Sequence, residues 1–197
     1  MSYANVGMMY PVFAPFVSHV DGEMPQYGTG RVIHEARTAN VTREFGDNPL
    51  HGDDRIVDDD NGMTGLRIEF ESTGLDDEDR VTLFGEESAG TTLGGYWESD
   101  NETPYGGFAY IRKMRGDAGK KYEVWLALKI KFQEATQSTT TRQGQISWGT
   151  PTITGRGASL DVDGSGKERF RIHQTFDSVS AAKAWINTML NVSAATT

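Results

Sequence analysis

Carboxylates are the side chains in this sequence whose clustering could do chemistry. Acidic clusters occur at Asp53-Asp54, Asp58–Asp60 and Asp76–Asp79. Paired carboxylates can hold a divalent cation or act as a general acid and a general base. Solvated loops and a helix cap explain the same clusters more simply, because acidic residues favour loops and the first turn of a helix. We therefore favour a structural interpretation of all three clusters.

Asp161–Gly166 (DVDGSG) imitates the start of a calcium-binding loop. An EF-hand needs a bidentate glutamate at the twelfth position of this loop, and that position is Ile172. Asp-Gly and Ser-Gly pairs suit a β-turn, which we prefer. The chain has no cysteine, and its four histidines show no metal-ligand spacing (His19, His34, His51 and His173). The sequence therefore predicts no metal, no cofactor and no enzyme activity.

Charge and hydropathy restrict the partners. The formal net charge of the 197-residue chain is −9, and an acidic surface repels phosphate backbones, which argues against free binding to nucleic acid. An acidic protein could still form a channel through which DNA passes without binding to the wall. No apolar run approaches the roughly 20 residues that span a bilayer, so we expect no membrane partner.

Strand patterns dominate the chain, and 23 glycines against 6 prolines suit strands joined by tight turns. The clearest strand is Met63–Ser72, whose apolar face carries Leu66, Ile68 and Phe70 and whose polar face carries Arg67, Glu69 and Glu71. Further strands are expected at Arg31–Phe45, Leu93–Trp97, Gly107–Met114, Lys121–Phe132, Gln145–Gly155 and Lys167–Phe176. Tyr10–Val17 contains two prolines and is an edge strand at best.

The expected strand Lys121–Phe132 alternates over its full length. The residues predicted to share its apolar face are Tyr122, Val124, Leu126, Leu128, Ile130 and Phe132. Two helices are expected. Leu75–Phe84 has an acidic first turn, a C-cap at Gly85, and Val81 and Phe84 three residues apart. Ser180–Asn191 has one apolar stripe. The sequence predicts a mainly β fold, an antiparallel β-sandwich with a flanking helix.

Three segments stand apart within an expected single domain over residues 1–197. Residues 1–9 form an apolar arm without clean periodicity, and residues 192–197 form a small, polar tail that we expect to fray. Gly46–Gly62 holds seven Asp or Asn residues before its final Asn61-Gly62 pair and lacks periodicity, apart from a possible short strand at Arg55–Val57. Structureless loops of this length are uncommon in folded domains and usually have a function.

The order of short strings along the chain carries a resemblance to a known family. Tyr10–Pro15 (YPVFAP) is followed by Tyr27–Gly30 (YGTG), Asn48–Asp54 (NPLHGDD) and Leu83–Gly85 (LFG). Thr103–Phe108 (TPYGGF), Tyr122–Trp125 (YEVW), Lys129–Phe132 (KIKF), Gln145–Ser147 (QIS) and Thr150–Gly155 (TPTITG) complete the series. This succession resembles the major tail protein, or tail tube protein, family of bacteriophages with long, non-contractile tails, over most of Tyr10–Gly155.

The resemblance implies a structural virion protein. In that family, β-sandwich subunits form hexameric rings that stack, and their inner sheets join into one continuous β-barrel around a channel for DNA. It implies assembly in the host cytoplasm, residence in the phage tail, and tail terminator, distal tail and tape measure proteins as partners.

The long loop would contact a neighbouring subunit through Asn48, Leu50, His51, Asp53, Asp54, Arg55, Ile56 and Val57. Arg67, Glu69 and Glu71 would face the lumen or a neighbour, with a net negative lining that repels DNA. The arm would make a second contact through Val6, Met8 and Met9.

Other interpretations remain open at this stage. A tail terminator or a secretion-tube subunit of related fold would share the pattern, although a terminator caps a tube and does not polymerise. A carbohydrate-binding β-sandwich module could stack sugars on Trp97, Tyr105 and Trp125. A hydrolase that uses the clustered carboxylates ranks last.

Overall fold

The fold is described from a computed structural model of the chain. It describes residues 3–33, 36–46, 49–52, 55–59, 62–98, 100, 102–117, 119–136 and 152–193, with the backbone alone at 36, 49–52, 55–59 and 134–136.

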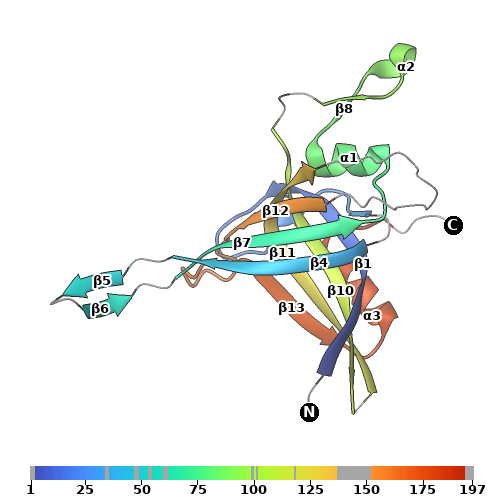
Figure 1. Cartoon of the computed structure of the whole chain (residues 1–197). Coiled ribbons are helices and arrows are strands. Elements are labelled where there is room, and N and C mark those ends of the chain that lie inside the picture. Colours follow the sequence, from blue (N-terminus) through green and yellow to red (C-terminus); the bar gives the residue numbers. More distant parts are fainter. Residues whose placement is uncertain are drawn as a thin grey trace, which may run out of the picture.

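Within the described residues, one antiparallel sheet of nine strands forms the body of the protein (Figure 1). Its strands are β1 (Tyr3–Ser18), β2 (Gln26–Tyr27), β3 (Arg31–Val32), β4 (Ala36–Phe45), β7 (Met63–Ser72), β10 (Tyr105–Gly116), β11 (Gly119–Thr136), β12 (Thr152–Ala158) and β13 (Arg171–Phe176). The hydrogen-bonded order is β2-β1-β10-β11-β12-β7-β4, with β3 beside β1 and β13 beside β11. The mainly β, antiparallel class predicted from the sequence is confirmed.

β1 is a long strand where the sequence predicted an arm followed by a short edge strand. Residues Tyr3–Met9, which the sequence indicated to be an apolar arm without clean periodicity, pair with the second half of β10 as part of this strand. Tyr10 has φ 56° and sits at a register shift, where one extra residue bulges out of β1 before Pro11. The bulge lets a proline-containing strand continue, while β3 and β2 pair with short parts of its outer edge.

The sheet folds over on itself, because side chains of strands that are not hydrogen-bonded neighbours meet in one core. The Phe70 ring of β7 lies 5.5 Å from the Phe108 ring of β10, and Phe108 lies 5.0 Å from Phe132 of β11. Leu66, Ile68 and Phe70 are each at most 2% exposed, which confirms the apolar face predicted for Met63–Ser72.

The apolar side chains of β11 enter two separate cores, although its sequence alternates regularly over its length. Between Ala127 and Ile130, one extra residue bulges out of its pairing with β10. Val124, Leu126 and Leu128 consequently belong to the core under α3, whereas Ile130 and Phe132 belong to the core inside the folded sheet. The prediction that all six apolar residues share one face is therefore wrong.

α3 (Val179–Met189) covers the outer side of β1, β10 and β11 (Figure 1). The Ser178 hydroxyl accepts from the Ala181 N–H and caps the helix, while Ala182, Ile186 and Leu190 are 0% exposed. The predicted helix Ser180–Asn191 is confirmed within a residue or two. Val192 forms a bridge to Gly30, so this part of the predicted tail is tied down; residues 194–197 lie outside the described part.

α1 (Asp77–Phe84) ends as predicted, with Gly85 in the left-handed region as C-cap, but it begins two residues after the predicted Leu75, with Asp76 as N-cap and a reciprocal capping box with Asp79. Its fully buried apolar residue is Leu83, whereas Phe84 is partly buried against the core and Val81 is exposed.

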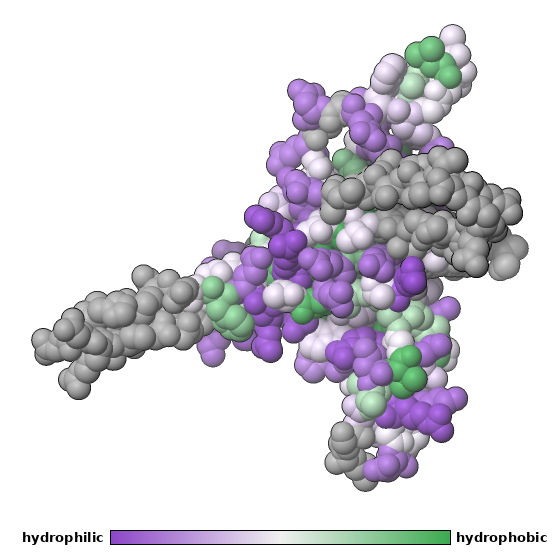
Figure 2. Space-filling view, in the orientation of Figure 1, coloured by the Kyte–Doolittle hydropathy of each residue, from purple (hydrophilic) through white to green (hydrophobic). Residues whose placement is uncertain are grey.

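The bounds of three other expected strands differ from those in the structure. Arg31–Phe45 is divided between β3 and β4, and Leu93–Trp97 is divided between α2 (Gly90–Leu93) and β9 (Tyr96–Trp97), which pairs with β8 (Glu87–Ser88). The α2 excursion stands away from the sheet, and its tip is apolar in Figure 2. The strand expected at Gln145–Gly155 is observed from Thr152, and residues 145–151 lie outside the described part.

Candidate functional site

The polar face of β7 is the starting point for the site. The side chains of Arg67 and Glu69 are 43% and 45% exposed, and their Nη2 and Oε1 atoms are 3.2 Å apart. The Nε atom of Arg67 is buried and has no hydrogen-bond partner among the described residues. Glu71, two residues further along, points the same way and is half-buried. All three residues predicted for the lumen thus lie opposite the core.

This polar face continues over four strands, because the register aligns β4, β7, β12 and β11 in rows. One row contains Asn40, Glu69, Thr154 and Gln133, and the next contains Thr42, Arg67, Arg156 and Lys131. Side chains directly opposite each other on one face of a sheet are close neighbours, so the second row is a line of three cations. The centre of Figure 2, over β4 and β7, is mostly hydrophilic.

The expected excess of negative charge on this face is not found. Within the described side chains of the aligned rows, the basic residues are Arg67, Lys129, Lys131 and Arg156, and the acidic residues are Glu44, Glu69 and Glu71. The Nζ atom of Lys131 also lies 2.8 Å from Oε1 of Glu102, and this contact lowers the pKa of that carboxyl. The face is therefore close to neutral, and the acidity of the chain lies elsewhere.

β4 leaves one of its edges free. Among the described residues it pairs with β7 alone, and it ends the strand order of the sheet. Register shifts occur only near its two ends, so Thr38–Glu44 presents a regular, unpaired row of N–H and C=O groups. The strand has no proline and no lysine in ten residues, two devices that commonly protect sheet edges. It is competent to pair with another strand.

The acidic insertion is a β-hairpin where the sequence predicted a long loop with a possible short strand at Arg55–Val57, which lies within the observed strand β6 (Arg55–Asp59). β5 (Pro49–Gly52) and β6 pair with each other, and Figure 1 shows the hairpin extending away from the sheet. At its base the Gly46 N–H donates to the Gly62 carbonyl at 2.9 Å, which continues the β4–β7 ladder. The predicted contact residues divide accordingly. Leu50 and His51 lie on β5, Arg55, Ile56 and Val57 lie on β6, and Asn48, Asp53 and Asp54 lie outside the described residues.

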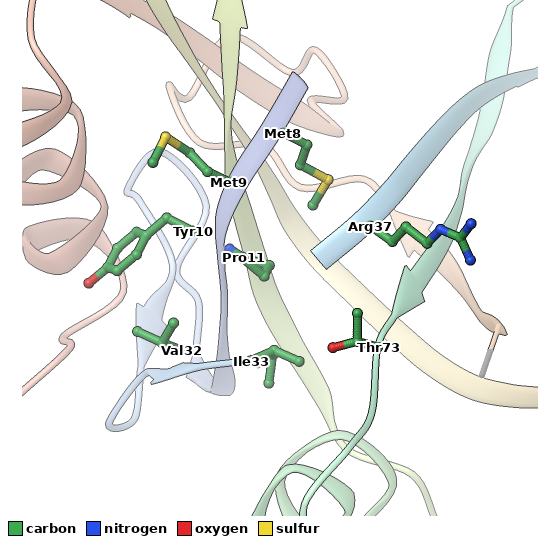
Figure 3. A pocket seen from close by; sticks show the side chains of 8 residues that line it. All are labelled: Met8, Met9, Tyr10, Pro11, Val32, Ile33, Arg37 and Thr73. Atoms are coloured by element: carbon green, nitrogen blue, oxygen red, sulfur yellow. The ribbon is translucent and has the colours of Figure 1, made fainter. Parts of the chain in front are cut away.

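The N-terminal contact residues differ in accessibility. Val6 is 63% exposed, whereas Met8 and Met9 are partly buried against the two cores of their own chain. Figure 3 shows them on opposite sides of β1, beside a hollow of about 480 Å³ between β1, β3 and the start of β4. Only Val6 of the three is free to form the contact that the sequence predicted.

Arg31 and the start of α1 form an ion cluster that sequence reasoning missed. Nε of Arg31 donates to Oδ1 of Asp79 at 2.8 Å, Nη2 to Oδ2 of Asp76 at 2.6 Å, and Nη1 to Glu78. Asp79 is 0% exposed. The acidic run Asp76–Asp79, expected to be a solvated cap, therefore fastens α1 to β3. The only signal for this cluster in the sequence was the excess of carboxylates in one helical turn, which suggests a basic partner.

The DVDGSG segment at Asp161–Gly166, weighed as a calcium loop, is a hydrogen-bonded turn. Asp161 and Asp163 accept backbone hydrogen bonds inside their own turn, and Arg169 pairs with Asp163 at 2.8 Å. No group of three or more potential metal ligands occurs among the described residues. Tyr105 lies five residues along β10 from Tyr110, the partner of Trp125, so these two aromatic side chains are separated by roughly 17 Å. They do not form one sugar-stacking surface.

Comparison with known proteins leaves the family open, because no family model and no curated protein matches the chain. Among the described residues, no helix has the length and the apolar character needed to cross a membrane.

Proposed function

We propose that the chain is a structural subunit, without enzyme activity, of the tail tube of a bacteriophage with a long, non-contractile tail. Copies form hexameric rings, the rings stack, and the tube conducts DNA into the host. Assembly takes place in the host cytoplasm and the product is part of the virion. The tail terminator, distal tail and tape measure proteins are the proposed partners, and DNA is a passenger without specific contacts.

The free edge of β4 is the observation that carries this proposal. A regular unpaired edge readily accepts a strand from another chain, and natural proteins usually blunt such edges. β4 also belongs to the four-stranded face that is apolar on the core side and polar on the other side. Edge-to-edge pairing of identical subunits joins these faces into one polar wall, and a head-to-tail contact that closes by rotation gives a ring.

The hairpin β5–β6 supplies a contact of a second kind. It continues the direction of β4 and β7 beyond the sheet, so it leaves the subunit along the strands (Figure 1). An element that reaches out in this direction suits a contact with the next ring, whereas the β4 edge suits a contact within the ring. The exposed Val6 on β1 is a third candidate contact.

Electron microscopy of the purified chain tests the proposal. We expect rings and long tubes in negative stain. A variant that replaces residues 47–61 with a two-residue Asn-Gly turn should keep the β4–β7 ladder, because the Gly46 nitrogen and the Gly62 oxygen are already hydrogen-bonded at 2.9 Å. This variant should remain a folded, soluble subunit that does not stack. Monodisperse monomers of the natural chain at high concentration, without tubes at any salt concentration, would refute the proposal. Short capping rings without growth would indicate a terminator instead.

A further inference from the structure

A cationic pocket lies beside the free edge of β4, in a chain whose net charge is −9. The cavity has a volume of about 350 Å³ and opens between the folded halves of the sheet. β4 contributes Ala39–Thr42, and β1 contributes Asn5 and Met8. Tyr110 and Arg112 of β10, Trp125 of β11 and Arg171 of β13 complete the lining. The pocket therefore combines two guanidinium groups with amide, hydroxyl and aromatic side chains.

Arg171 is held in place without an anionic partner. Its guanidinium carbon lies 4.0 Å from the centre of the Trp125 ring, and it makes no hydrogen bond or ion pair with any described residue. Burial lowers the pKa of this guanidinium, and the charges of Arg43 and Arg112 lower it further, while Tyr110 and the Glu123 carboxylate act in the opposite direction. A partly desolvated cation stacked on an aromatic ring is preorganised for a carboxylate, because little conformational freedom remains to be lost.

One carboxylate in the neighbourhood is already shared among several donors. Oε2 of Glu123 accepts from Nε1 of Trp125 at 2.7 Å and from Nη1 of Arg112 at 3.3 Å. Oε1 of Glu123 lies 3.8 Å from Nδ1 of His173. Two arginines, Arg112 and Arg171, line the pocket, and the charge of Arg43 also acts on Arg171, so three guanidinium groups stand near the Glu123 carboxylate within the described part of the chain.

We propose that this pocket binds carboxylates, and that its occupant is the Asp-rich hairpin β5–β6 of a second copy of the chain. Six aspartates and one arginine lie between Gly46 and Gly62, which gives this short insertion a formal charge of −5. In its own chain the hairpin extends away from the sheet (Figure 1), in a position from which it can reach another molecule. The pocket adjoins the edge through which copies pair, and the inference thus rests on the proposed function.

Peptide binding tests the pocket directly. A synthetic peptide of residues 46–62 is titrated into the full chain by calorimetry, at a concentration at which the chain is still monomeric. The matched control is the same peptide with every aspartate replaced by asparagine. We expect the acidic peptide to bind, the control peptide to bind at least about tenfold more weakly, and added salt to weaken the binding of the acidic peptide.

Variants then locate the binding site. Arg171→Gln and Arg112→Gln should each weaken peptide binding about tenfold or more. Lys183→Gln should leave binding unchanged, because Lys183 stacks on Tyr10 from α3, on the opposite side of β1. Thermal melting shows whether each variant is folded, and Arg112→Gln keeps the test decisive if Arg171→Gln does not fold. Equal binding of the two peptides, or unchanged binding to both arginine variants, would overturn the inference.

Microscopy separates this inference from the proposed function. If the natural chain forms tubes and the arginine variants form equally long and regular tubes, the pocket does not hold the hairpin, while the tube function stands. If the natural chain forms no rings or tubes, the function itself fails. Tubes from the natural chain together with short or irregular stacks from both arginine variants would support the pocket.

Discussion

Arg31 offers the sharpest test of how α1 is held. Its guanidinium contacts carboxylates of Asp76, Glu78 and Asp79, and among these only Asp79 is completely buried, while the Glu78 side chain is 72% exposed. Arg31→Gln removes the cation that contacts the buried Asp79 carboxylate. An uncompensated buried charge is far more costly than the loss of an exposed ion pair.

The magnitude follows from these exposures. Removal of one partner of a buried pair costs about 3–5 kcal/mol. Because the Arg31 side chain is itself 29% exposed, water replaces part of the lost interaction, and we expect Arg31→Gln to lower the free energy of unfolding by about 2–4 kcal/mol. Glu78→Gln, on the exposed carboxylate, should cost less than about 1 kcal/mol. The double variant Arg31→Gln/Asp79→Asn should be more stable than Arg31→Gln alone, because a neutral side chain is less costly to bury than a carboxylate that has lost the Arg31 cation.

Urea denaturation of the monomeric subunit, followed by circular dichroism, measures all four proteins under one condition. The m-value should remain constant, so that shifts of the midpoint report stability. Equal costs for Arg31→Gln and Glu78→Gln would show that water, and not Arg31, compensates Asp79. The same conclusion would follow if Asp79→Asn gave no recovery in the Arg31→Gln background.

Three further predictions concern other parts of the fold. Gly155→Ala should destabilise the subunit by about 1–3 kcal/mol, because a Cβ there would lie 2.6 Å from core side chains of β11. Gly74→Ala, where a Cβ meets nothing within 4 Å, should stay within about 0.5 kcal/mol in the same urea assay; equal effects would contradict the packing argument. Ile186→Ala should cost about 2–5 kcal/mol, because this residue of α3 is 0% exposed, and a cost below about 1 kcal/mol would show that α3 packs loosely. The Ser165 hydroxyl and Arg169 hold the pKa of Asp163 at about 2 instead of 3.8, so the stability from this carboxylate is complete above pH 4 and is lost as the pH falls toward 2. An NMR titration of the Asp163 carboxyl should show this midpoint and a rise in Ser165→Ala, and an ordinary midpoint would refute it.

Local signals were sufficient for some elements. Within the strand Met63–Ser72, residues Leu66–Glu71 alternate between apolar and polar and are buried on one face, so the period of the sequence matched the period of the structure there. The helices were marked by their caps and their acidic or apolar turns. In each case the residues that specify the strand or helix lie close together in the sequence.

Long-range pairing decided what the sequence could not predict. One extra residue in β11 moves Ile130 to the other core without disturbing the alternation in the sequence. Residues 3–9 became a strand only because β10 lies beside them. The carboxylates that Arg31 contacts lie 45–48 positions further along the chain, and a single sequence does not predict contacts between residues so far apart. Of the candidate site, Arg67, Glu69 and Glu71 were correctly predicted to lie opposite the core, but the cationic row that contains Arg67 depends on the register of two other strands, β12 and β11.

β10 occupies the middle of the molecule, with one core on each side. From Gly106 to Ile111 every residue is buried, and successive side chains enter opposite cores: Phe108 and Tyr110 the one inside the folded sheet, Ala109 and Ile111 the one beneath α3. β10 therefore stands between the outer helix and the strands of the proposed wall, with close-packed side chains on both of its faces. A force on the helix would reach that wall through the core beneath α3, through β10, and through the core inside the folded sheet.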